Sequence, residues 1–244
     1  MEVSLYSAAS AMNATERWQD LIADNLSTAS VPGSRQRTAI FSAVPAGLSG
    51  LNGENFVIPM ANSAVNFQPG ELRPTGNHMD FAIEGPGFIG VQMPDGSKGY
   101  TRDGEFKLNA QGQLITKQGY RVLADNGNLQ FDPNNPAPIT VDGDGQVTQG
   151  AEAKGKISIA EFKSPQSLTM LGGGLFRNDV PGMDPERITT SKIRQGYIEL
   201  ANCSPTLAMA SMITSMRMFE SNEKVMSMQS ERMAKTITDL SGTN

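Results

Sequence analysis

Few residues of this chain have the types and spacing that catalysis requires. The single histidine, His78, and the single cysteine, Cys203, stand far apart in the sequence, and no motif marks a nucleophile beside either. We expect His78 in a surface turn and Cys203 as a small packing residue. The carboxylates are scattered, so no pair is identified as a general acid and base. The residues therefore indicate no enzyme, and no cofactor is predicted.

The run Asp142–Gln146 is similar to the start of a calcium-binding loop. Such a loop needs glycine at its sixth position and an acidic residue at its twelfth, where this chain has Val147 and Ala153. The run Gly172–Gly174 is not followed by Lys and then Ser or Thr, so it is no phosphate-binding loop. We predict a hairpin turn at the first run, a loop at the second, and no metal site.

Composition excludes several classes of protein. The chain has a formal net charge of −5, and its densest basic run, Arg35–Arg37, is short, which argues against nucleic-acid binding. One cysteine excludes an internal disulfide. No apolar run reaches the roughly 18 residues of a membrane span, and the N-terminus lacks the regions of a secretory signal peptide. These facts suggest a soluble protein, and they leave open export by a route that reads other signals.

A long helix is predicted from Pro205 to Leu240. Ser204 followed by Pro205 is typical of a helix start, with a hydroxyl N-cap and proline at the first helical position. Methionine dominates its apolar residues, which recur at alternating steps of three and four. Since methionine is flexible, this seam suits several slightly different neighbours. The predicted interface residues of this helix are Met209, Met212, Met216, Phe219, Met226, Met233 and Ile237.

A weaker helical pattern covers about the first thirty residues and ends before Pro32 and Gly33, which cannot continue a helix. One reading is that the two end helices cover only each other. The N-terminal helix is too short and too rich in alanine to cover the whole C-terminal one, so we predict that the seams also contact other subunits. The predicted interface residues of the N-terminal helix are Leu5, Met12, Trp18, Ile22, Asn25 and Leu26.

The middle of the chain has the pattern of an antiparallel β meander. Turn pairs such as Asp95-Gly96 and Asp103-Gly104 recur at a short, even spacing from Asp80 onward, with apolar residues between them. We therefore predict an α+β fold, in which long N- and C-terminal helices form a coiled-coil inner domain beside a central, mainly antiparallel β domain. The expected divisions are residues 1–40 and 200–244 for the helical inner domain, 41–75 for an irregular connecting segment, and 76–199 for the β-rich outer domain.

Three runs of sequence together resemble the axial rod and hook family of the bacterial flagellum. The first is Ala23–Gly33, with the letters ADNLSTASVPG. The second lies within Gly70–Val122 and includes GELRPTGNHMDFAIEGPGFIGVQ, and the third is Gln195–Asn202, QGYIELAN. The runs appear in the family's order and span nearly the whole chain. The segments Met216–Glu220 and Phe41–Gly47 resemble the proximal rod branch most.

The resemblance implies a structural subunit of the flagellar basal-body rod. Proteins of this family pass through the flagellar type III export apparatus without a cleaved signal peptide. They polymerise helically in the periplasm and build the drive shaft that transmits torque. The implied partners are copies of the chain, other proximal and distal rod proteins, the export apparatus and the surrounding ring proteins, with no nucleic acid and no direct membrane span. We also expect the end helices to be largely disordered before assembly and to order on docking.

Other functions remain open at this stage. The chain could be the distal rod protein or another axial paralogue. Such a protein would have the same kind of sequence and differ in its position along the axial structure. A β binding module displayed on a coiled coil would need an exposed aromatic platform, yet the single tryptophan, Trp18, falls in the predicted N-terminal helix. A hydrolase that opens the cell wall would need a positioned carboxylate or a metal site.

Overall fold

A computed structural model of the chain describes residues 2–49, 55–125, 127–133, 135–186 and 190–241. The chain divides into two compact units. Unit 1 consists of Met1–Leu26, Arg37–Val65 and Pro205–Asn244, and unit 2 consists of Ser27–Gln36 and Asn66–Ser204. The backbone therefore passes from one unit to the other at four places along the sequence.

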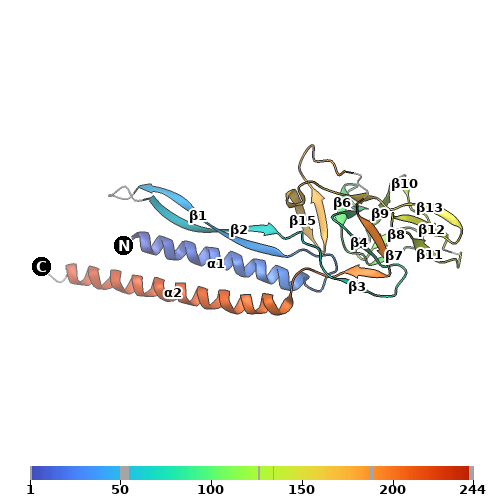
Figure 1. Cartoon of the computed structure of the whole chain (residues 1–244). Helices are drawn as coiled ribbons and strands as arrows, with labels where there is room; N and C mark the ends of the chain where they lie inside the picture. Colours follow the sequence, from blue (N-terminus) through green and yellow to red (C-terminus); the bar gives the residue numbers. More distant parts are fainter. Residues whose placement is uncertain (1, 50–54, 126, 134, 187–189, 242–244) are drawn as a thin grey trace. The chain divides into compact units, whose positions relative to one another are not determined.

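Unit 1 contains two single helices and a β hairpin (Figure 1). Helix α1 spans Glu2–Thr28 and helix α2 spans Pro205–Ser241. Strand β1 (Arg37–Ser49) pairs antiparallel with β2 (Asn55–Val65). The ring of Trp18 in α1 meets the ring of Phe41 in β1 edge to face, with centroids 5.8 Å apart. An aromatic contact thus joins the hairpin to the first helix.

The structure corrects the predicted fold class. We expected the two terminal helices to form a coiled-coil inner domain, and the described residues show no such domain, only one helix at each end of a mainly β chain. The physical reason is that α1 shares its apolar side chains with a third element, because Trp18 packs on β1. The expected irregular segment 41–75 also differs, since most of it belongs to the hairpin. Strand β1 of the hairpin contains Thr38, Ile40 and Phe41, which are residue types that favour extended backbone.

Unit 2 is built on a mainly antiparallel sheet of nine strands. Seven strands follow the order β15-β16-β6-β5-β9-β8-β7, while β10 pairs with β9 and β14 pairs with β5. Their bounds are β5 Phe88–Gln92, β6 Lys98–Thr101, β7 Phe106–Leu108, β8 Leu114–Thr116, β9 Arg121–Ala124, β10 Gly127–Asn128, β14 Ile159–Ala160, β15 Leu168–Gly172 and β16 Leu175–Asn178. A 3-10 turn, η1 (Pro165–Ser167), precedes β15.

Smaller sheets complete unit 2 and lead the chain toward α2. Strands β11 (Ile139–Val141), β12 (Gln146–Gln149) and β13 (Glu152–Lys156) form one antiparallel sheet. Strand β17 (Lys192–Gln195) pairs with β4 (Phe81–Glu84), and β18 (Tyr197–Glu199) pairs with β3 (Leu72–Pro74). The last strand before α2 is therefore hydrogen-bonded to a strand from the first third of the chain.

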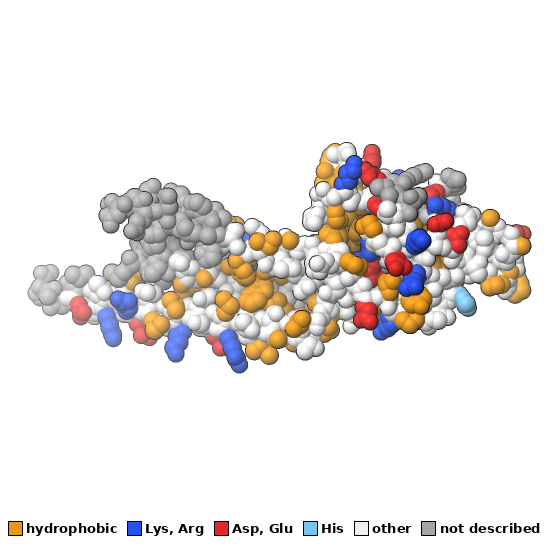
Figure 2. All heavy atoms as spheres, viewed as in Figure 1, with side chains coloured by type: hydrophobic (Ala, Val, Ile, Leu, Met, Phe, Trp, Pro, Cys, Tyr) orange, Lys and Arg blue, Asp and Glu red, His pale blue; other side chains and the backbone are white. Residues whose placement is uncertain are grey.

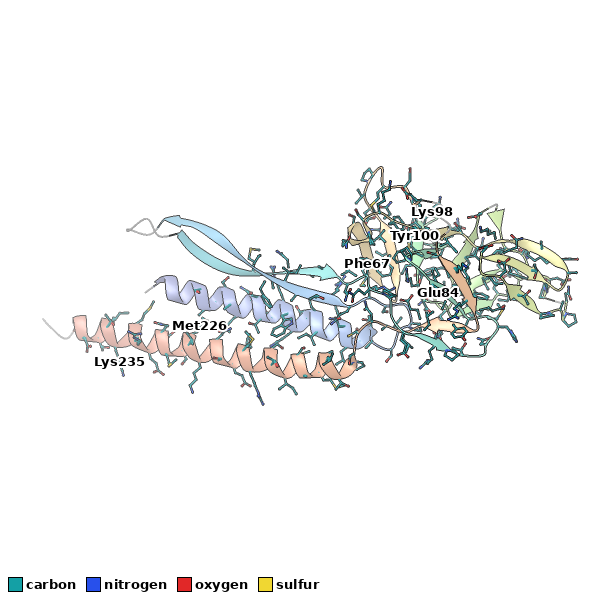
Figure 3. All side chains as sticks on the ribbon, in the orientation of Figure 1. Phe67, Glu84, Lys98, Tyr100, Met226 and Lys235 are labelled. Carbon is teal, nitrogen blue, oxygen red and sulfur yellow. The ribbon has the colours of Figure 1, made fainter. Side chains whose placement is uncertain are left out.

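Two groups of buried side chains form the core of unit 2. The larger one is aliphatic with a few aromatic rings, and includes Phe81 stacked on Phe106 at 5.7 Å between centroids. The smaller one is aromatic and centres on Phe88 and Phe176, whose rings meet edge to face at 5.5 Å. Phe67, labelled in Figure 3, packs against both of these rings. This aromatic group lies beside Arg102, whose guanidinium carbon is 5.0 Å from the centre of the Phe88 ring.

Candidate assembly helices and the buried junction

A buried carboxylate between two arginines lies next to the start of α2. Glu199 is 0% exposed, and Arg35 and Arg102 are 2% and 4% exposed. Arg35 Nη2 lies 2.6 Å from Glu199 Oε1, and Arg102 Nη1 lies 3.0 Å from Oε2. The Gly70 amide also donates to Oε1, at 2.7 Å. Because a buried charge is costly without partners, these contacts tie four distant parts of the chain to one another.

Asn202 joins three of these parts of the chain through its side-chain amide. Its Nδ2 donates to the carbonyl oxygens of Asn66 and Gln68, at 2.8 and 2.9 Å. Its Oδ1 accepts from the Gln36 amide at 2.7 Å. We call the four segments 33–36, 66–70, 101–103 and 199–202, all in unit 2, the junction. Three of them stand next to the places where the chain enters or leaves unit 1.

Two glycines allow the backbones of the junction to approach closely. Gly33 has φ +70°, and a Cβ there would lie 2.2 Å from the carbonyl carbon of Arg102. A Cβ on Gly70 would lie 1.9 Å from the Leu200 oxygen. The Gly33 amide donates to the Glu199 oxygen at 2.8 Å. Any side chain at these two positions would force the segments apart, so the junction requires glycine.

Asp103 adds a buried carboxyl group at the edge of the junction. Burial raises its pKa to about 6, because the charged form is poorly solvated there. The Glu105 amide donates to its Oδ1 at 3.1 Å. The Thr101 hydroxyl accepts from the Asp103 amide and donates to the Gly174 carbonyl, both at 3.0 Å. The turn after β6 is thereby held against the glycine loop at residues 172–174.

The junction brings together residues from all three runs that resemble the family. Gly33 ends the first run, Arg102 and Gly70 belong to the second, and Glu199 and Asn202 belong to the third. Sequence reasoning did not identify these residues as a site. Arg35 was treated as part of a short basic run, although it is a core residue. The available signal was the presence of charged and amide residues inside otherwise apolar or glycine-rich runs.

The predicted interface residues of α1 lie on covered faces of the helix. Ile22 is buried, and Met12 and Leu26 are half-buried. Leu5 falls in α1, but its side chain lies outside the described residues. The covering of Ile22 and its neighbours shows that this face is already occupied within the chain, and interface roles for these residues stay a prediction.

Two other predicted residues of α1 are engaged within unit 1. Trp18 contacts Phe41, as described above. Asn25 is buried, and its side chain makes two hydrogen bonds of 2.7 Å with the backbone of Arg37, donating to the oxygen and accepting from the amide. Asn25 therefore fixes the start of β1 against the end of α1.

Helix α2 has one covered stripe, and it is shifted from the predicted seam. Met212, Phe219, Met226 and Met233 are partly covered, as expected of seam residues. Each of the other covered residues comes one position before a predicted seam position and has a small or polar side chain. The covered residues of the helix are Ala208, Ser211, Met212, Ser215, Phe219, Asn222, Met226, Gln229 and Met233.

The other predicted residues of α2 are open to solvent. Met209, Met216 and Ile237 are 54%, 51% and 66% exposed. Figure 2 shows hydrophobic side chains along the helical unit on the visible face, between lysine and arginine side chains. In the view of Figure 3, Met226 and Lys235 project from opposite sides of α2. These exposed apolar side chains lie outside the covered stripe of the helix.

The residues that the sequence analysis considered for catalysis or metal binding lie in turns or in the packed interior. Asp142 forms the turn between β11 and β12, and its Oδ1 accepts from the Gln146 amide at 2.8 Å, which confirms the predicted hairpin. His78 is exposed in a turn, as expected. Cys203 is buried, and burial raises the pKa of its thiol. Within the described ranges, no cluster of His, Cys, Asp and Glu could hold a metal ion, and no helix is long and apolar enough to span a membrane.

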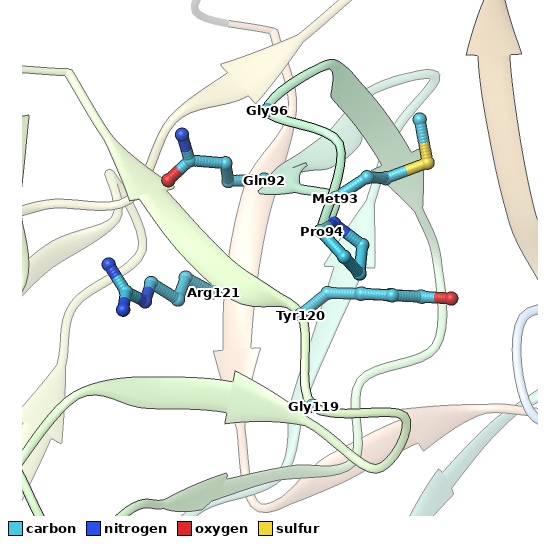
Figure 4. A pocket seen from close by; sticks show the side chains of 7 residues that line it. All are labelled: Gln92, Met93, Pro94, Gly96, Gly119, Tyr120 and Arg121. Carbon is cyan, nitrogen blue, oxygen red and sulfur yellow. The ribbon is translucent and has the colours of Figure 1, made fainter.

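A shallow pocket of about 340 Å³ lies on the β unit (Figure 4). Its lining residues come from the turn after β5 and from the start of β9, and they are Gln92, Met93, Pro94, Gly96, Gly119, Tyr120 and Arg121. None of these seven is a carboxylate, histidine or cysteine, so the pocket offers no acid, base or nucleophile pair.

Comparison with known proteins gives the family. Residues 82–149 match the family described as flagellar hook protein FlgE/F/G D1 domain, and residues 194–240 match flagellar basal body rod FlgEFG protein C-terminal. The chain is 32% identical to the flagellar basal-body rod protein FlgF of Caulobacter vibrioides, over 100% of both chains.

Further relatives agree with this match. The FlgF protein of Mesorhizobium japonicum is 33% identical over 93% of this chain and 92% of its own length. The FlgG rod protein of Borreliella burgdorferi is 31% identical over 91% of this chain and 92% of its own length. These full-length relatives confirm the predicted resemblance, including its proximal rod type. The chain belongs to the flagellar basal-body rod protein family, whose members are structural rod subunits.

Proposed function

We propose that this rod subunit polymerises helically in the periplasm and forms part of the drive shaft that transmits torque. Rod proteins assemble with other rod components in the basal body. Helical growth needs contacts between different surfaces of successive copies, because a contact that pairs one patch with itself closes into a dimer. The observation that carries the proposal is the uncovered apolar surface of α2.

The exposed large apolar side chains of α2 are too many to be incidental. They run along the length of the helix and comprise Leu207, Met209, Ile213, Met216, Met218, Val225, Met228 and Ile237. Several large exposed apolar side chains on one helix are typical of interaction sites in soluble proteins. Methionine makes up half of this set, which suits contacts with copies and with related rod proteins of slightly different shape.

A division of labour is part of the same proposal. We propose that the expected inner domain, residues 1–40 and 200–244, supplies the inner wall of the rod and that residues 76–199 supply the outer wall. The uncovered part of α2 would be largely disordered in the free subunit and order on docking. The junction would then pass load from the helices to the β unit, since buried ionic contacts and close backbone packing resist deformation.

The remaining partners belong to the same proposal. The subunit would contact proximal and distal rod proteins along the rod and the surrounding ring proteins at its outside, after export through the flagellar type III apparatus. Its role would be mechanical rather than enzymatic.

A pair of matched variants tests the role of α2. Met216→Glu places a charge on the uncovered apolar surface. Ala210→Glu places the same charge at another exposed position of α2, which shares a seven-residue spacing with Arg217, Lys224 and Glu231. Each variant replaces the native copy in the host, and motility and the presence of the protein in isolated basal bodies are measured.

We expect Met216→Glu to abolish incorporation and motility, while Ala210→Glu retains both. The purified Met216→Glu subunit should keep the unfolding midpoint of the native protein, because Met216 is already half exposed. Normal incorporation of Met216→Glu would contradict the proposal.

A further inference from the structure

The junction contains buried hydrogen-bond donors that the protein itself leaves unpartnered. Among the described residues, Arg35 Nε and Nη1, Arg102 Nε and the Ser34 hydroxyl are buried without a hydrogen-bond partner. Arg35 Nη2 meets Glu199 as an ion pair at 2.6 Å and otherwise has no hydrogen bond. Buried polar groups in folded proteins almost always have a partner, so these donors call for one.

The same place carries an excess of positive charge. Arg35 and Arg102 share one carboxylate, Glu199, through its two oxygens. The pKa of Arg35 is lowered, first by burial and then by the charge of Arg102, and Glu199 is the anionic group that opposes this effect. Among the side chains in direct contact, two guanidinium groups face the single carboxylate of Glu199, while the Asp103 carboxyl at the edge of the junction accepts from the Glu105 amide instead, so one positive charge lacks a direct counter-charge. An uncompensated interior charge is strongly unfavourable.

We propose that the junction binds a small monovalent inorganic anion of the size of chloride, held by Arg35, Arg102 and the Ser34 hydroxyl. The anion would accept the unpartnered N–H and O–H groups and cancel the net charge, whereas a water molecule would satisfy the donors and leave the charge. A carboxylate from a neighbouring subunit cannot reach the site, because the Arg35 and Arg102 side chains are 0% and 3% exposed.

Anion binding would strengthen the contacts among the segments of the junction. The anion would bridge residues 34 and 35, which follow α1, to residue 102 beside the sheet. Glu199 already links both arginines to the strand before α2. Anion binding is therefore expected to stabilise the folded subunit by an amount that rises with the logarithm of the anion concentration once the concentration exceeds Kd.

The first test compares thermal unfolding of the full chain in sodium chloride, sodium bromide and sodium gluconate at equal ionic strength. Gluconate is much larger than either halide and serves as the anion that a chloride-sized site should reject. We expect the unfolding midpoint to be higher in both halides by about 3 °C or more. Arg35→Gln removes the excess charge and should abolish the difference between the salts. Arg73→Gln, at an exposed arginine of β3, should retain it.

A second measurement keeps the test decisive if Arg35→Gln fails to fold. Crystals of the native chain grown in bromide should show an anomalous peak within hydrogen-bond distance of Arg35 and Arg102. Equal midpoints in all three salts together with no bromide peak at the junction would overturn the proposal. So would a halide effect of the same size in folded Arg35→Gln, because the anion would then act elsewhere.

Discussion

Arg35 Nη2 lies 2.6 Å from Glu199 Oε1, although Arg35 follows the first helix and Glu199 precedes the last one. Both side chains are almost completely buried. The contact means that the segment after α1 and the segment before α2 are fastened to each other within unit 2. It also means that the structure of the junction depends on both segments being present in the same folded subunit.

Removing the charge of Glu199 should be far more damaging than removing that of an exposed glutamate. Glu199→Gln leaves Arg35 and Arg102 buried without a counter-charge, and we expect a loss of about 3–5 kcal/mol in the free energy of unfolding. Glu84→Gln is the matched control, because Glu84 pairs with Arg194 at the surface and should cost about 1 kcal/mol or less. Urea unfolding of both variants measures the difference, and equal costs would show that the buried ion pairs do not stabilise the junction.

Gly33 and Gly76 offer a test of close packing against backbone strain. Both have φ +70°, but a Cβ on Gly76 meets nothing within 4 Å. Gly76→Ala should therefore cost only the backbone strain, about 1–2 kcal/mol. Gly33→Ala adds a clash with the Arg102 backbone and should cost several kcal/mol more. Thermal unfolding compares them, and similar midpoints would mean that the segments at Gly33 separate easily.

Asp103 should give the subunit a measurable loss of stability above about pH 4. Its pKa of about 6 in the folded chain exceeds the value of about 3.9 in an unfolded chain, so the folded state binds the proton more tightly. Its contribution is fully present below pH of about 4 and is lost as the pH rises through 6, by up to roughly 3 kcal/mol.

The variant Asp103→Asn isolates this effect. It carries no titrating proton and keeps an oxygen that can accept from the Glu105 amide. We expect it to be more stable than the native chain at pH 7, with the difference shrinking toward pH 4. Urea unfolding across this range gives both curves, and parallel curves would show that the folded and unfolded chains bind the Asp103 proton equally tightly.

Trp18 and Phe41 should be energetically coupled, since their rings meet edge to face at 5.8 Å. A double-mutant cycle with Trp18→Leu and Phe41→Leu is expected to give a coupling of about 0.5–1.5 kcal/mol. The single tryptophan also reports on the hairpin, so its emission should shift to the red in Phe41→Leu. Met60→Leu, at an exposed position of β2, should leave the emission unchanged. An additive cycle would mean that the hairpin is not docked on α1 in solution.

Local patterns in the sequence determined much of the secondary structure. Ser204 and Pro205 marked the start of α2, and the seven-residue recurrence of Met212, Phe219, Met226 and Met233 placed four of its covered residues. The Asp142 turn also followed from local residue types, because its side chain bonds to a backbone amide only a few residues ahead. The hairpin at residues 37–65 was missed, because its proline and glycine content hid the strand pattern.

Tertiary structure decided which residues the seams and the junction use. The other half of the covered stripe of α2 falls at Ala208 and Ser215 rather than Met209 and Met216, since the phase of a stripe depends on the neighbour that covers it. Glu199 meets Arg35 and Arg102 only after the whole chain has folded, and no local pattern pairs residues so far apart. A charged residue in the sequence is expected at the surface, and only the folded contacts show that these three are buried together.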